Sequence, residues 1–259
     1  MGAIYTRTLK GAFFILLFFL VLWQIISFFN LIDEFWLPAP YKFFSTVYIF
    51  FSEGIIQKHI LITVKRLLLG FLLGSISGLL VSYICCSSRK IRFFLEPLIY
   101  ITFPIPRFAV LPFIILIFGT GMSSKIIFIA LAAFFPVTIN TIKGITEVNT
   151  NFSEVALHYG AKGFKLFTRV IFPGSLQSAF VGLRISLGMS LAYVTVIEYL
   201  SAMDGIGAML WMSLQILRID QLLLGILIIT MLSIILISLL TVIEKLAMPW
   251  VQRNDRDAY

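Results

Sequence analysis

The sequence has few charged residues for its length. Only 12% of the 259 residues are charged, whereas hydrophobic residues make up 60% and the mean hydropathy is +1.03. Soluble domains have about 25% charged and about 45–50% apolar residues. A chain this apolar would precipitate in water unless lipid covered it. The composition therefore excludes an ordinary soluble protein and indicates a membrane protein.

Residues that carry covalent or metal chemistry are also scarce. The two cysteines, Cys85 and Cys86, are adjacent, and His59 and His158 are the two histidines. Adjacent cysteines rarely bond to each other, and this set does not complete a usual zinc site. The sequence contains no GxxxxGK[ST] phosphate loop and no residue cluster placed for hydrolysis. We therefore predict no catalytic residue, no metal, no cofactor and no ATP binding by this chain.

The charge that is present is mostly positive. The net charge is +8 and the isoelectric point is near 9.6. In a soluble protein this balance would suggest nucleic acid as a partner. Here the basic residues form short clusters between apolar runs, which is typical of topology signals that face anionic lipid. We predict membrane lipid as a partner and no nucleic acid.

Long apolar runs predict an all-α, polytopic membrane protein with about six transmembrane helices, since about 20 apolar residues cross a bilayer. The runs cover residues 11–29, 67–86, 93–118, 126–142, 176–200 and 222–243. Between the first two, Pro38 and Pro40 mark a break, and 41–62 has the pattern of an interfacial helix. Basic residues gather near both termini and in segments 87–92 and 143–173. This asymmetry places both termini in the cytoplasm.

Two of the runs have unusual compositions. The run 67–86 has glycines four residues apart, which predicts a face for close helix packing; they are Gly70, Gly74 and Gly78. The run 93–118 contains four prolines, which no regular helix holds without a kink; they are Pro97, Pro104, Pro106 and Pro112. Broken helix is tolerated at membrane depth only where protein or water surrounds it. We therefore expect the run 93–118 to face the interior of the bundle.

Two charged residues in apolar runs are candidates for the translocation path. Arg107 either attracts an anion there, or satisfies carbonyls freed by the nearby prolines, or pairs with an acid on another helix. Glu198, near the outer end of its run, either shapes the path or pairs with Arg218 or Arg66. For Glu198 the pairing is the favoured interpretation.

The polar segment 143–173 predicts a short helix between two spans. Ser153 can cap it, Glu154 suits its first turn, and Gly160 can end it, which gives a helix over 154–159. A helix of this length is not stable alone, so it must dock against something. Pro173 suits the first turn of the next span.

The same segment resembles a known family. EVALHYG at 154–160, followed by VIFP at 170–173, resembles the conserved cytoplasmic loop of ABC importer permeases, in which Glu154, Ala156, Gly160 and Pro173 have the family's spacing and Val155 replaces an alanine. The segments 104–145, 182–200 and 205–207, with Glu244, Lys245 and Trp250, are similar to the branch that imports nitrate, sulfonates, taurine and pyrimidine precursors of thiamine. The resemblance covers residues 55–250.

The resemblance implies a permease that performs no covalent chemistry. It implies that a coupling helix contacts a separate ABC ATPase subunit through one set of residues, with Pro173 behind it: Glu154, Val155, Ala156, Leu157, His158, Tyr159 and Gly160. The other implied partners are a periplasmic or lipid-anchored substrate-binding protein and a second permease copy. A homodimer is expected, although the sequence of one chain does not distinguish a homodimer from a pair of two different permeases.

The expected organisation follows from the spans and the resemblance together. Residues 1–62 form an N-terminal transmembrane helix and a periplasmic or interfacial segment, 63–250 the permease domain with its coupling loop at 143–173, and 251–259 a cytoplasmic tail. The expected location is the bacterial cytoplasmic (inner) membrane. A small anion is the first candidate substrate and a thiamine precursor the second. The rival classes are an ion-coupled secondary transporter, which would need internal repeats and acids within its spans, and a membrane enzyme, which would need a catalytic cluster.

Overall fold

The computed structural model describes residues 2–201 and 203–250, with side chains for residues 14, 15, 17–148, 152–200 and 203–250. Within that part the chain is helical and contains no strand, which agrees with the predicted class. The helices are α1 (Gly2–Phe28), α2 (Pro40–Ser52), α3 (Ile55–Cys86), α4 (Arg89–Thr102), α5 (Arg107–Phe118), α6 (Met122–Asn151), α7 (Ser153–His158), α8 (Phe164–Leu166), the π-helix η1 (Phe167–Ile171), α9 (Phe172–Ser201), α10 (Ile206–Gln215) and α11 (Ile219–Ala247).

Four helical segments of the described chain are long and apolar enough to cross a membrane. They are Ile55–Cys86, Met122–Val148, Phe164–Leu200 and Ile219–Ala247, and the bent pair α4–α5 adds a fifth if it counts as one span. In α1, the stretch Leu17–Phe28 is a shorter apolar helix. The structure therefore agrees with a multi-pass membrane protein and gives four or five candidate spans, and six remains a prediction.

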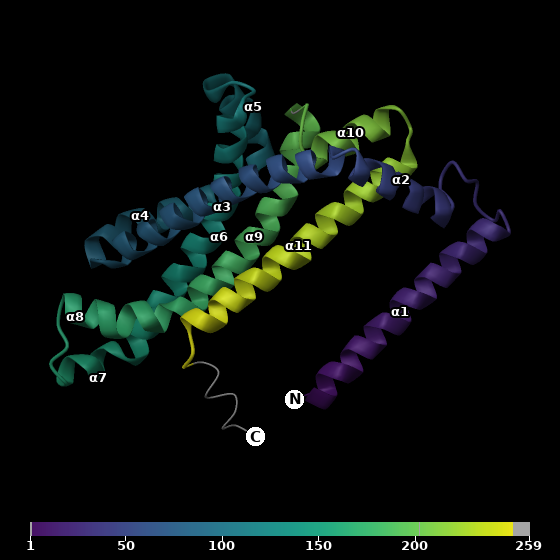
Figure 1. Ribbon diagram of the computed structural model, residues 1–259. Helices are drawn as coiled ribbons and strands as arrows, with labels where there is room; N and C mark the ends of the chain where they lie inside the picture. Colours follow the sequence, from purple (N-terminus) through teal and green to yellow (C-terminus); the bar gives the residue numbers. More distant parts are fainter. Residues whose placement is uncertain (1, 202, 251–259) are drawn as a thin grey trace.

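Helix α6 lies at the centre of the bundle. It packs along both α3 and α9, and its apolar face is buried between them at Phe128, Ile129, Ala133 and Val137. Figure 1 shows α9 and α11 running along a similar direction, with α3 at a shallower slope. The hairpin of α7 and α8 lies at one end of these helices, and α2, α10 and the end of α5 lie toward the other.

The three glycines of α3 form the predicted packing face. A Cβ at Gly70 would come within 2.6 Å of the Cβ of Ile129, and one at Gly78 within 2.9 Å of the carbonyl oxygen of Phe134. At Gly74 an added Cβ would collide with the backbone of Ala130. Only glycine lets the two backbones approach this closely, so the spacing of four residues fixes α3 against α6.

The bounds predicted for an interfacial helix over residues 41–62 were wrong. Helix α2 ends at Ser52, and Gly54, with a φ of 75°, lets the chain turn before α3 begins at Ile55. A left-handed backbone favours glycine because it has no Cβ. Residues 55–66 therefore belong to the same continuous helix as the apolar run 67–86.

The proline-rich run 93–118 is broken, as its composition predicts, but it is not buried in this chain. Helices α4 and α5 meet at an angle of 99°, across the segment that contains Pro104 and Pro106. Large side chains on both helices are exposed, among them Phe93, Ile101, Phe113 and Leu116. The expectation that the run lies inside this chain's own bundle was wrong, because each of its two helices packs on the bundle by one side only.

Candidate functional site: a coupling hairpin and a buried ion-pair network

The segment 143–173 is more helical than its polarity suggests. Helix α6 continues to Asn151, α7 follows after Phe152, and the chain returns through α8 and η1 into α9. Pro173 is the second residue of α9, but α9 continues directly from η1, so Pro173 lies inside the continuous segment Phe164–Leu200 and not in the first turn of a span. Helix α7 begins at Ser153 itself with Phe152 in the cap position, so Ser153 is not the cap residue that the sequence suggested.

The end of α7 follows the predicted glycine signal. Gly160 has a φ of 80°, and its N–H donates to the carbonyl of Leu157 at 3.0 Å, while Ala161 N–H donates to the carbonyl of Ala156 at 2.9 Å. This pair of bonds is the Schellman arrangement, which satisfies the last carbonyls of a helix and requires a left-handed residue. Gly160 thus stops the helix after less than two turns and turns the chain back toward α8.

The outer surface of this hairpin is apolar and uncovered. Tyr159 is 89% exposed and Phe164 is 80% exposed, and Val155 and Leu157 are exposed beside them. Glu154 and His158 are also exposed. A short helix that presents aromatic and aliphatic side chains to solvent is typical of a surface that another protein covers.

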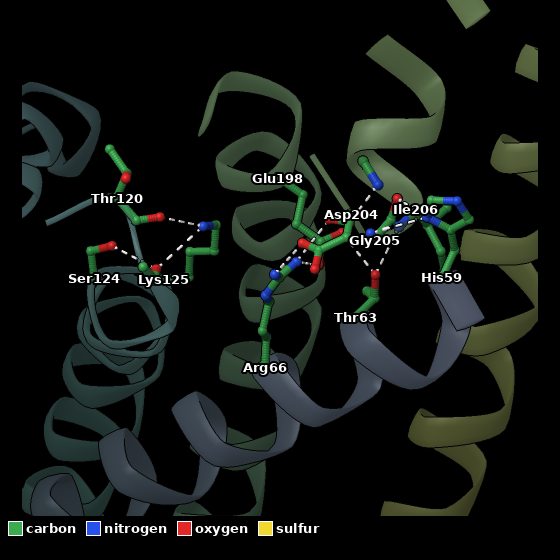
Figure 2. A network of polar contacts seen from close by, with 12 residues as sticks. His59, Thr63, Arg66, Thr120, Ser124, Lys125, Glu198, Asp204, Gly205 and Ile206 are labelled. Carbon is green, nitrogen blue, oxygen red and sulfur yellow. Dashed lines mark hydrogen bonds and ion pairs between the residues drawn. The ribbon is translucent and has the colours of Figure 1, made fainter. Parts of the chain in front are cut away.

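The second site is a buried polar network between α3 and the junction of α9 with α10. His59, Thr63 and Arg66 lie on one face of α3, because they are four and three residues apart (Figure 2). Arg66 donates from Nη1 to Glu198 Oε1 at 2.8 Å and to the carbonyl of Asp204 at 2.9 Å, and from Nη2 to the Asp204 carboxylate. The guanidinium therefore holds the end of α9 and the following turn together.

The other carboxylate oxygen of Glu198 is also satisfied. This oxygen, Oε2, accepts from Thr63 Oγ1 at 2.7 Å and from the N–H of Gly207 at 3.1 Å, and Thr63 Oγ1 in turn accepts from the N–H of Ile206 at 2.9 Å. The Glu198 side chain is fully buried. A buried carboxylate is tolerated only when it is paired and hydrogen-bonded, and both conditions hold here.

The turn itself depends on glycine. Gly205 has a φ of 101°, and a Cβ there would collide with the Glu198 carboxylate. Its N–H donates to His59 Nδ1 at 3.1 Å. Outside the spans, the hydrogen bond from Arg66 lowers the pKa of Asp204. The network therefore couples α3, α9 and the start of α10 through main-chain and side-chain contacts at once.

Of the two pairing partners considered for Glu198, the structure selects Arg66. Arg218 instead forms an ion pair with Asp220 at 2.8 Å. The role of Thr63, His59 and Asp204 was missed, although the sequence carried one signal for it: Arg66 is a charge within an apolar segment that must find a partner.

Arg107 lies elsewhere, at the bend between α4 and α5. Its guanidinium carbon is 5.2 Å from the ring centre of Phe103 and 5.1 Å from that of Phe135. Its hydrogen-bond acceptor is the carbonyl of Phe103 at 3.5 Å. Pairing with an acid of this chain, one of the alternatives for this residue, does not occur among the described side chains.

Comparison with known proteins decides the family. Residues 70–253 match the family model described as binding-protein-dependent transport system inner membrane component. The chain belongs to the ABC importer permease family. The members of this family are transport proteins and not enzymes, so the α7 hairpin and the Arg66 network belong to a transport protein.

Curated relatives in this permease family fall in the branch that the sequence suggested. The chain is 31% identical to the putative aliphatic sulfonates transport permease protein of Bacillus subtilis, over 89% of this chain and 84% of the relative. It is 29% identical to the nitrate import permease protein of Synechococcus elongatus, over 74% and 72% of the two chains. It is 30% identical to the formylaminopyrimidine transport permease protein of Halalkalibacterium halodurans, over 75% and 76%.

Proposed function

We propose that this chain is the transmembrane subunit of an ATP-driven importer in the bacterial cytoplasmic (inner) membrane. A small solute, delivered by a periplasmic or lipid-anchored binding protein, would cross through it, and a separate ABC ATPase would supply the energy. The family match supports the class, and the exposed hairpin of α7 and α8 is the observation that carries the coupling to an ATPase.

The position of the hairpin supports a mechanical role. Helix α7 follows α6 after a single residue, Phe152, and α6 packs closely along both α9 and α3. A push on α7 would therefore reach the centre of the bundle without passing through a flexible linker. The surface defined by residues 154–160 is where we place the ATPase contact.

The exposed apolar faces of α4 and α5 support a second permease copy. Phe93, Ile101, Phe113 and Leu116 have no cover within the described chain. A second copy related by a twofold axis would bring these faces together around a path, since homo-oligomers are mostly symmetric. The hairpin, the beginning of α1 and the end of α11 lie toward the same end of the bundle (Figure 1), which fits termini and hairpin that are all cytoplasmic.

The substrate is proposed to be a small anion of the nitrate, sulfonate or taurine type. Relatives named for sulfonate and nitrate transport support this choice. A relative named for formylaminopyrimidine transport supports the second candidate, a pyrimidine precursor of thiamine.

A cysteine crosslink tests the coupling surface. Cys85 and Cys86 are first replaced by alanine, and one cysteine is then placed by Ala156→Cys or Tyr159→Cys. With the ATPase co-expressed, we expect a crosslinked adduct whose yield changes when nucleotide binds, because ATP would close the ATPase subunits and move the hairpin.

The matched control is Ser123→Cys in the same thiol-free background. Ser123 is exposed and lies at the opposite end of α6 from the hairpin. It should give no adduct with the ATPase. If the ATPase is present in the membrane and neither Ala156→Cys nor Tyr159→Cys reacts with it, the proposed coupling surface is wrong.

A further inference from the structure

Arg107 is a cation whose hydrogen-bonding capacity is largely unfilled. A guanidinium has five N–H donors. Within the described residues, one of them meets the carbonyl of Phe103 at 3.5 Å, which is at the limit for a hydrogen bond. The Nε atom is buried without any partner. The protein therefore leaves most of this group's donors without acceptors.

The guanidinium is nevertheless held in place. The rings of Phe103 and Phe135 lie on it with centroid distances of 5.2 and 5.1 Å, and the two rings are 6.1 Å apart. Such cation–π contacts orient the guanidinium plane without using its N–H donors, because the attraction comes from the ring faces. The arrangement fixes a cation and leaves the N–H groups of Nη1 and Nη2 as the donors that a solute can meet, since Nε is buried.

The depth of Arg107 in the membrane narrows the possible ligands. Phe135 is the central residue of the 27-residue span Met122–Val148. At about 1.5 Å per residue, Phe135 lies roughly 20 Å along the helix from either end of that span. The hydrocarbon core is about 30 Å thick, so lipid phosphates lie about 15 Å or more from its midplane. A span centred in the bilayer would put Phe135 and Arg107 near the midplane, where a lipid headgroup would be badly placed to reach the guanidinium.

The broken backbone beside Arg107 gives a second reason to expect solvent or solute there. Pro104 and Pro106 interrupt the chain between α4 and α5, where the helices bend by 99°. Irregular backbone at membrane depth is tolerated only where it is buried in protein or lines a water-filled cavity. In this chain Pro104, Ile105 and Pro106 are exposed, so they are not buried by its own bundle.

We propose that Arg107 is the residue that binds an oxyanion halfway along the translocation path, where its free N–H groups donate to a sulfonate, a nitrate or a carboxylate group. The inference rests on the proposed permease function and assigns the recognition of its anionic solute to one residue. Two oxygens on one planar or tetrahedral group match the fork of a guanidinium, which is why arginine binds such groups with two parallel hydrogen bonds.

The first test uses thiol reagents of opposite charge, so it works before the solute is identified. A single cysteine is placed by Val110→Cys, one helical turn from Arg107, in the chain lacking Cys85 and Cys86 and assembled with its ATPase. Reaction rates are compared for 2-sulfonatoethyl and 2-(trimethylammonium)ethyl methanethiosulfonate. We expect the anionic reagent to be favoured, and Arg107→Gln to reduce that preference about tenfold, since an unpaired cation in a confined path concentrates anions.

Two variants separate charge from structure. Arg107→Lys keeps the charge and should retain most of the preference. Arg89→Gln removes an exposed arginine from the start of α4 and should leave the preference unchanged. Equal rates for the two reagents with Arg107 present would overturn the inference.

A competition distinguishes a soluble anion from a lipid phosphate. Added nitrate or methanesulfonate should slow the anionic reagent at Val110→Cys when Arg107 is present, and should have no effect in Arg107→Gln. A lipid phosphate bound at Arg107 would remove both the preference and the competition, which would also overturn the inference.

The same preparations separate failure of this inference from failure of the permease proposal. If the Ala156→Cys chain forms its ATPase adduct but Val110→Cys shows no charge preference, Arg107 is not an anion site and the coupling proposal stands. If neither Ala156→Cys nor Tyr159→Cys forms an adduct, the permease proposal fails, and the path in which Arg107 was placed fails with it.

Discussion

Arg66 and Arg107 both lie in apolar segments of this permease, and their surroundings differ in almost every respect. Arg66 is buried, and its guanidinium faces the carboxylates of Glu198 and Asp204. Arg107 is half-buried, contacts two aromatic rings, and meets no carboxylate of the described chain. A charge within a membrane has a cost in both places, but only at Arg66 does the protein itself offset it.

The difference separates a cation that holds the fold from one that is available to a ligand. Arg66 and its partners join α3 to the end of α9 and to the turn before α10, so removing one of them leaves another charge buried without compensation. Removing Arg107 leaves no orphaned acid. The first arginine should therefore govern stability and the second should govern what the path accepts.

The largest expected effect comes from Glu198→Ala. It leaves Arg66 without its buried carboxylate, and Thr63 Oγ1 and Gly207 N–H without their acceptor. Breaking one side of a buried ion pair costs about 3–5 kcal/mol, so we expect a sharp fall in the melting temperature of the purified protein. Thermal unfolding in detergent and the amount of chain in the membrane measure this.

A double replacement tests whether the ion pair causes that loss. Arg66→Met with Glu198→Leu removes both charges and keeps much of the volume, so it should be more stable than Glu198→Ala alone. Glu244→Ala is the matched control, because Glu244 pairs with the partly exposed Arg184 and such pairs contribute about 0–1 kcal/mol. If the double variant is no better than the single one, shape at this junction matters and charge does not.

A smaller loss should follow from Gly74→Ala on the face that sets α3 against α6. The added Cβ would collide with the Ala130 backbone, and such overpacking costs about 1–3 kcal/mol. Gly188→Ala in α9 is the control, since nothing lies within 4 Å of its added Cβ. There we expect a gain of about 0.5–1 kcal/mol, because alanine favours a helix over glycine. Equal effects of the two changes on the melting temperature would show that the Gly74 contact does not fix α3.

These features differ in how far local sequence reveals them. The spacing of Gly70, Gly74 and Gly78 and the position of Gly160 are local signals, and the structure uses both as predicted. Helix α10 was not predicted, because its ten residues are too few to cross a membrane. The pairing of Arg66 with Glu198 joins residues 132 positions apart, and a single sequence does not select between distant partners.

The prediction that α4 and α5 are buried was wrong for a different reason. Pro104 and Pro106 correctly predicted broken helix, and the membrane requires protein or water around it. The sequence of one chain does not say which chain provides that surrounding. The exposure of the apolar face of α5 therefore could not be predicted from the sequence of this chain.

Arg107→Met tests whether Arg107 contributes less to stability than Arg66 does. The change loses two cation–π contacts, worth about 0.5–1 kcal/mol each at exposed sites, and it also removes an uncompensated charge from the membrane. These effects oppose each other, so we expect the free energy of unfolding to change by about 1 kcal/mol or less. Melting of the purified protein, compared with Arg66→Met, checks this. A loss as large as that of Arg66→Met would mean that Arg107 also holds the fold.

The smallest effect concerns Asp204, the more exposed partner of Arg66. The hydrogen bond from Arg66 lowers its pKa from the ordinary 3.8. Its contribution to stability is therefore complete above that ordinary pKa and is lost as the pH falls through the lower folded value. Because the Asp204 side chain is 46% exposed, solvent screens the pair, and we expect no more than about 1 kcal/mol.

Melting temperatures measured from neutral pH down to about pH 3 should show this as a difference between the wild type and Asp204→Asn. The wild type should be the more stable at neutral pH, and the two curves should converge in acid, since a protonated Asp204 and an asparagine are both neutral. Curves that coincide at every pH would show that the main-chain carbonyl of Asp204, which also accepts from Arg66, holds the turn without help from the carboxylate. In that case Glu198 alone compensates Arg66, and the contrast with Arg107 depends on a single buried acid.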